Sequence, residues 1–284
     1  MRTMVKRSLK RFWRIGYLIS FSLVLSILVW VFASTNQMPT VNIISQQTVF
    51  ALHGPLHPDD EGVKAVWETL INDLQRKEML AGKLLSWCGV PRELTLVLYG
   101  SQPLRVVAGN FNRGFRWLWL LTRILGKRYK GSHYISWHSF IFGMHGGTAI
   151  VAEDETAFHQ AVENLALVKE RVKQTLKLTR QLQNRYDFIG FIKPQPLRNS
   201  YQFPADLGEI GIDIVDANEL RGSVFWICQG EREAEAMMKV LEQMESKMAA
   251  EYAKKRVRCS FRKHREGMFL WWEFRLTNFL SLWF

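Results

Sequence analysis

A long uncharged stretch near the start of the chain most constrains how it can fold. Residues 15–58 contain no Asp, Glu, Lys or Arg, and within them residues 15–33 read IGYLISFSLVLSILVWVFA. At a rise of about 1.5 Å per residue, a helix of this length spans a bilayer core of about 30 Å. A cleaved signal peptide is the alternative, because Val31 and Ala33 have the spacing that signal peptidase accepts, but the run exceeds a usual signal sequence. We therefore expect a transmembrane helix over residues 15–34.

The flanking sequence gives this expected helix a direction. Residues 1–14 contain six basic residues and no acidic one. Basic flanks remain in the cytoplasm, so residues 1–14 form a cytoplasmic tail, residues 35–47 a polar stalk, and the rest lies outside. None of the asparagines begins an Asn-x-Ser/Thr acceptor site, which favours a bacterial envelope protein. We expect an integral single-pass protein of the bacterial inner membrane with an extracytoplasmic main domain.

The net charge comes from two short runs. The chain has a formal charge of +12, and residues 1–14 supply half of it. Outside this tail and one later basic cluster, 25 basic and 26 acidic residues nearly cancel. Nucleic-acid binding usually needs basic residues across a whole face, so we do not expect it. The later cluster is the candidate surface for an anionic partner: Lys254, Lys255, Arg256, Arg258, Arg262, Lys263 and Arg265.

The remainder predicts an α+β protein with two similar units. Alternating apolar residues indicate paired strands at 93–99 and 104–109, and again at 209–215 and 220–228. The order of elements is ββαββ in each half, so we expect two antiparallel sheets covered by helices. The first unit covers residues 48–185 and ends in a long helix, and the second covers residues 186–284.

Two segments carry a resemblance to a known family. They are TAIVAEDETAFHQAVENL at 148–165 and ADLGEIGIDIVDANELRGSVFWICQGEREAEAMMKVLE at 205–242. In both, a strand that ends in a small residue and an acid leads into a helix with Ala-rich spacing. This pattern resembles an uncharacterised family of single-pass, membrane-anchored bacterial envelope proteins. The resemblance implies the fold and the location, and it transfers no functional residues.

Two surfaces are candidates for contact with partners. In residues 256–264, strand alternation places Arg256, Arg258, Arg262 and His264 on one face. Acidic lipid headgroups, a polyanionic polymer or another envelope protein could bind there, and cross-strand salt bridges are the alternative. A second segment combines Trp and Leu with a basic edge, which is typical of an interfacial helix and also of a core helix with a basic solvent face. Its candidate residues are Arg113, Arg116, Trp117, Trp119, Arg123 and Lys127.

One more helix is expected over residues 231–254, and it carries a stripe of methionines. The stripe predicts core packing, with a groove for a partner as the alternative. Its members are Met237, Met238, Leu241, Met244 and Met248.

No sequence motif identifies a reaction or a cofactor. The chain has no Walker loop, no Gly-x-Ser-x-Gly and no His-Glu-x-x-His, and His133 and His138 are spaced to lie on opposite faces of a strand. Cys228 and Cys259 are the candidates for a disulfide, with three buried thiols as the alternative. We therefore expect a membrane-anchored, extracytoplasmic binding or assembly module of the cell envelope, without catalytic residues, metal, cofactor or an identifiable small-molecule substrate. A membrane-tethered envelope hydrolase or transferase with an unrecognised active site is the alternative.

Overall fold

The structure is a computed structural model of the 284-residue chain. It describes residues 22–26, 37–77, 83, 86, 88–100, 104–111, 115–137, 140–166, 186–193 and 208–282. Across these ranges no helix combines the length and the apolar character needed to cross a bilayer. The expected helix over residues 15–34 falls outside them except at 22–26, which are helical. The finding contradicts the prediction of an integral single-pass protein of the inner membrane.

The strands of the described ranges form one antiparallel sheet of twelve. Their order across the sheet is β11-β12-β10-β9-β8-β1-β2-β3-β7-β6-β5-β4. In chain order they are β1 (Thr48–Pro55), β2 (Pro91–Tyr99), β3 (Leu104–Phe111), β4 (Lys127–Tyr129), β5 (Ser132–Trp137), β6 (Phe140–His145), β7 (Thr148–Ala152), β8 (Phe188–Ile192), β9 (Gly208–Ile214), β10 (Glu219–Ile227), β11 (Arg258–Glu266) and β12 (Phe269–Thr277).

The two halves of the chain meet at the pairing of β1 with β8. Phe50 lies opposite Ile192, and His53 lies opposite Ile189. The prediction of two separate ββαββ units with their own sheets is therefore wrong, because this pairing makes the sheet continuous across both halves. Alternation along a strand shows which face is buried, but it does not show which strand lies alongside.

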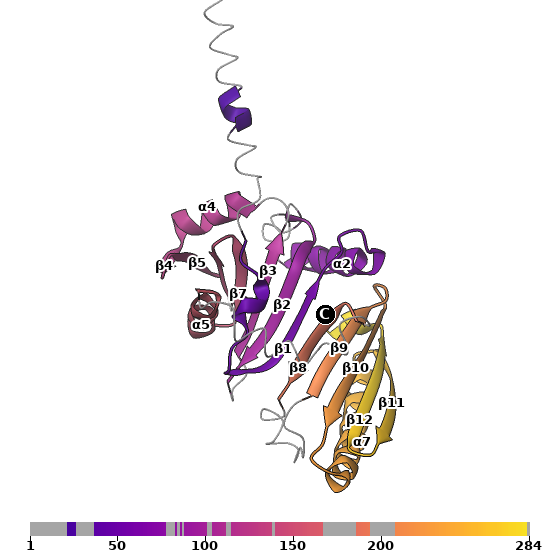
Figure 1. The fold of residues 1–284 in the computed structure, drawn as a ribbon. Helices are drawn as coiled ribbons and strands as arrows, with labels where there is room; N and C mark the ends of the chain where they lie inside the picture. The colour runs from indigo at the N-terminus through magenta and orange to yellow at the C-terminus, as the bar shows by residue number, and fades with distance from the viewer. Residues whose placement is uncertain are drawn as a thin grey trace, which may run out of the picture.

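Helices lie on both faces of the sheet (Figure 1). The helix α5 (Glu155–Ala166) and the short η1 (Thr40–Ile43) cover one face of the N-terminal half, where Phe158 packs with Val97 and Val106. The opposite face carries α2 (Glu61–Lys77) and, in the C-terminal half, α7 (Glu231–Lys254). Two further helices with printed bounds are α4 (Phe115–Leu125) and η4 (Phe279–Leu282).

The strand order is the same on both sides of the β1–β8 junction. Moving outward, β1-β2-β3-β7-β6 on one side corresponds to β8-β9-β10-β12-β11 on the other. In each half a helix follows the third strand: α4 follows β3, and α7 follows β10. These helices differ in length, with 11 residues in α4 and 24 in α7. Of these two helices, only α7 is therefore long enough to run along the strands of its half.

Candidate functional site

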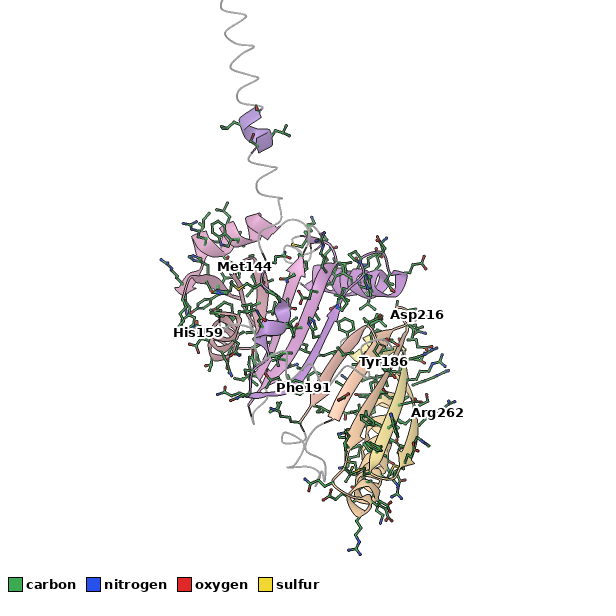
Figure 2. All side chains as sticks on the ribbon, in the orientation of Figure 1. Met144, His159, Tyr186, Phe191, Asp216 and Arg262 are labelled. Atoms are coloured by element: carbon green, nitrogen blue, oxygen red, sulfur yellow. The ribbon has the colours of Figure 1, made fainter. Side chains whose placement is uncertain are left out.

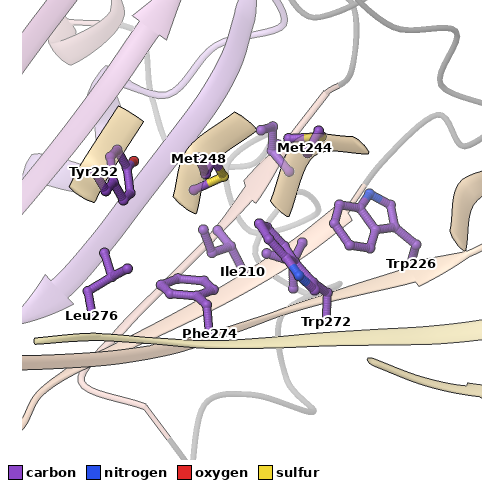
Figure 3. A pocket seen from close by; sticks show the side chains of 10 residues that line it. Ile210, Trp226, Met244, Met248, Tyr252, Trp272, Phe274 and Leu276 are labelled. Atoms are coloured by element: carbon purple, nitrogen blue, oxygen red, sulfur yellow. The ribbon is translucent and has the colours of Figure 1, made fainter. Parts of the chain in front are cut away.

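An apolar cavity of about 210 Å³ lies between α7 and the strands of the C-terminal half (Figure 3). One wall comes from α7 and the other from four strands. The lining side chains are Met244, Met248 and Tyr252 of α7, Ile192 of β8, Ile210 of β9, Val224 and Trp226 of β10, and Trp272, Phe274 and Leu276 of β12.

Simple periodicity brings these residues together. Met244, Met248 and Tyr252 are four residues apart, so they lie on one face of α7. On the sheet, Val224 pairs with Trp272 on one side and with Ile210 on the other. Paired residues in neighbouring strands point to the same face, so all three face α7.

The methionine stripe divides into two parts. Met237 and Leu241 are fully buried in the core between α7 and the sheet, which confirms the expected core packing there. Met244 and Met248, further along the same face, are only half-buried and line the cavity. A cavity therefore lies at one end of the stripe, and the partner groove that the sequence left as an alternative stays a prediction.

One polar atom in the cavity wall lacks a partner. The indole nitrogen of Trp226 is buried and makes no hydrogen bond within the described part of the chain. The second indole, Trp272, donates from Nε1 to Glu245 Oε1 at 2.8 Å. Glu245 also accepts a bond from Lys263 Nζ at 2.8 Å, so this charge is compensated. Trp226 thus leaves one donor unsatisfied beside the cavity, close to Gly208 of β9.

Tyr252 brings a phenol to the cavity. Burial is the largest cause that raises the pKa of Tyr252, and the nearby Cys259 and Glu251 raise it further. The phenol therefore stays neutral at physiological pH, and the lining carries no formal charge.

The basic cluster is split between two faces of β11. Arg258, Arg262 and His264 are exposed, whereas Lys263 lies on the α7 side with Glu245. Side chains two residues apart on a strand share a face, so Arg265 lies on the same side as Lys263. Arg256 precedes the strand with a φ of 61°, in the turn that follows α7. Lys254 ends α7 and Lys255 follows it, and both are exposed.

The expected interfacial helix is partly a cover for the sheet. Trp119 packs with the core residues Phe111 and Met144, and the guanidinium of Arg123 lies 4.9 Å from the centre of its ring. Lys127 follows α4 and pairs with Glu155 at 2.6 Å. Arg113 lies outside the described residues, as do the side chains of Arg116 and Trp117.

Sequence reasoning missed a buried polar network beside β1. His53 Nδ1 lies 2.8 Å from Thr95 Oγ1, and His53 Nε2 lies 3.8 Å from Glu93 Oε1. Thr95 in turn donates to Thr40 at 2.7 Å. A hydroxyl, an imidazole and a carboxylate resemble the parts of a hydrolase triad, but Thr95 and Thr40 are completely buried. Substrate cannot reach Thr95, so the network is structural. No sequence signal indicates this network, because His53, Thr95 and Glu93 come together only through the pairing of β1 with β2.

Metal ligands and a disulfide do not occur in the described structure. No three His, Cys, Asp or Glu side chains within the described ranges converge as a metal site would require. No disulfide joins Cys88, Cys228 or Cys259 within the described residues. The two candidates for a disulfide do not pair, because Cys228 follows β10 near Met268 whereas Cys259 faces Leu276 near the far end of β12. Burial raises the pKa of Cys88 to about 12, so this thiol is not a nucleophile at neutral pH.

Comparisons with known proteins return only distant structural similarity. No protein-family model matches the chain, and no curated protein matches it. Two crystal forms of TP0453 match 87% of this chain and 96% of their own. Form IV has a TM-score of 0.49 at 9% identity, and form I has a TM-score of 0.48 at 10% identity. With scores below 0.5, this similarity establishes neither a family nor a function. The resemblance to a membrane-anchored envelope family remains a prediction.

Proposed function

We propose that this protein is a non-catalytic binding module that holds an apolar chain in the cavity between α7 and the sheet. One observation carries the proposal: all ten side chains that line the cavity are aliphatic, aromatic or thioether groups. Ligand pockets typically combine such a lining with a few placed polar groups.

The size of the cavity supports a slender ligand. An apolar cavity of about 150 Å³ stays dry and binds benzene. The volume here is larger, about 210 Å³, so it accommodates part of an alkyl chain. Met244 and Met248 form one wall, and the flexible thioether side chain adapts to irregular apolar shapes.

The unpaired donor of Trp226 refines the choice of ligand. A buried N–H group without a partner costs free energy, and a ligand oxygen that accepts its hydrogen bond recovers that cost. The ligand class that fits both features is an alkyl chain with an oxygen acceptor at one end, such as a fatty acid. The uncharged lining suits the alkyl part of such a ligand and disfavours a metabolite that is charged along its length.

A catalytic role finds less support. Of the described side chains that line the cavity, Tyr252 alone is titratable. A catalytic cleft usually gathers several titratable groups with shifted pKa values. Burial shifts the pKa values of His53 and Tyr99 too, but neither residue lines the cavity, so Tyr252 has no second titratable group beside it in the described lining.

Displacement of a fluorescent fatty acid tests the proposal. Full-length protein should bind cis-parinaric acid saturably, and lauric acid should compete for the site. Met248→Trp fills the cavity and should abolish binding, whereas Val215→Trp adds the same ring at an exposed valine and should not. Equal binding by both variants, with both melting as the wild type does, would show that the ligand lies elsewhere.

A separate variant tests whether the indole N–H of Trp226 donates a hydrogen bond to the ligand. Trp226→Phe keeps an aromatic ring but removes the N–H group, so affinity for lauric acid should fall about tenfold relative to dodecane. An unchanged ratio between the two ligands would remove the hydrogen bond from the proposal and leave the apolar lining alone.

A further inference from the structure

The outer edge of β11 offers an open site for another strand. β11 is the last strand of the sheet and pairs with β12 alone within the described part of the chain. It forms the outer border of the C-terminal half (Figure 1). About every second of its nine residues therefore points its backbone N–H and C=O groups toward the free edge, while the others bond β12. Such an edge is a template for an added strand.

Three arginines of β11 make no ion pair with the described residues around them. Among the described residues, no ion pair involves Arg258, Arg262 or Arg265. Figure 2 shows Arg262 at the outer side of the strand, away from the core. Lys263 differs, because it is held by Glu245 on the α7 side.

The two faces of β11 have different chemistry. On the exposed face lie Arg258 and Arg262, with Glu273 of β12 opposite Arg262. On the α7 face lies the half-buried Phe261, whose ring stacks on Trp272 with centroids 5.5 Å apart. An added strand would therefore have cations beside its residues on one face and an aromatic ring beside its residues on the other.

We propose that β11 binds an extended acidic segment of a protein partner as an additional strand of the sheet. Acidic residues of that segment lie beside Arg258 and Arg262, and an apolar residue between them lies beside Phe261. The period of two along a strand makes this an alternation of acidic and apolar residues. A second copy of β11 is a poor occupant, since the strand carries four basic residues and one acidic residue and would repel itself.

A labelled peptide of alternating Glu and Val tests this inference by fluorescence anisotropy with the full-length protein. We expect saturable binding that weakens as salt rises through the physiological range. Arg258→Glu with Arg262→Glu should weaken it at least tenfold. Arg123→Glu with Arg128→Glu makes the same change in net charge in the other half of the sheet and should leave binding within about twofold of the wild type.

Two further probes separate strand addition from simple charge attraction. The same peptide with N-methyl groups on alternate residues keeps its charge but cannot complete the ladder, so it should not bind. Polyglutamate lacks the apolar alternation and should bind at least tenfold more weakly. Binding by either probe as tight as that of the alternating peptide would overturn the proposal. An equal loss of peptide affinity in the two double charge variants would also overturn the proposal. Dimerisation of the protein through β11 would do the same.

Discussion

At the scale of single residues, His53 shows what burial does to a polar side chain in this sheet. Its ring is hydrogen-bonded to Thr95 and lies near Glu93. Burial lowers the pKa of His53 below the ordinary 6.5, and the nearby charge of Glu93 opposes this only in part. The folded protein therefore binds a proton at His53 less readily than the unfolded chain does.

This difference predicts how stability depends on pH. Where the unfolded state binds more protons, the free energy of unfolding rises with pH. The contribution of His53 should therefore be complete above pH 7 and be lost as pH falls through about 6.5 toward the lower folded pKa. His53→Asn keeps a group able to bond Thr95 but cannot be protonated. Urea denaturation should show a smaller loss of stability between pH 7.5 and pH 5 in this variant.

The difference in pH-dependent stability between the wild type and His53→Asn isolates the contribution of His53. Burial also lowers the pKa of His133 and of His145, but these residues remain in both proteins and cancel in the difference. Identical pH profiles for the wild type and His53→Asn would show that burial does not perturb this histidine.

At the scale of elements, the sequence located individual segments well. The four strands expected at 93–99, 104–109, 209–215 and 220–228 agree within two residues with β2, β3, β9 and β10. The helix expected at 231–254 has the bounds of α7. These elements were predictable because each has an apolar face with its own period.

The same pattern could not predict the cavity or the free edge. Met237 and Met244 occur on one stripe of α7, yet one is fully buried and the other lines the cavity. The difference depends on where β8 and β9 lie relative to α7, and local periodicity carries no information about that distance. β8 itself (FIGFI) was not recognised, because a short apolar run without alternation is ambiguous.

Replacing the central leucine of α7 should lower the free energy of unfolding strongly, because this side chain is buried. Leu241 is fully buried between α7 and the sheet, so Leu241→Ala removes apolar contacts and leaves a cavity. Such changes cost about 2–5 kcal/mol in the free energy of unfolding. Gln243→Ala, at an exposed position of the same helix, should cost less than about 0.5 kcal/mol. Urea denaturation of both variants measures the difference, and similar small losses would contradict the packing of α7.

At the scale of the whole molecule, the β1–β8 junction turns two halves into one sheet. Gly190 lies at its centre, opposite Leu52 of β1 and Ile210 of β9. A Cβ atom at position 190 would lie 1.8 Å from the carbonyl oxygen of Ala51, which is backbone and cannot rotate away. The close approach of the two central strands therefore requires glycine here.

Gly190→Ala should accordingly separate the halves or distort the sheet. Forced overpacking costs about 1–3 kcal/mol and sometimes more, and a clash with backbone belongs at the upper end of that range. Gly230→Ser is the control, because position 230 is open, its backbone is extended, and serine is favoured before a helix such as α7. We expect Gly190→Ala to lower the urea midpoint strongly and Gly230→Ser to leave it unchanged or slightly raised. Equal midpoints would mean that β8 does not pack against β1 as closely as the structure has it, and the continuous sheet would then lose its support.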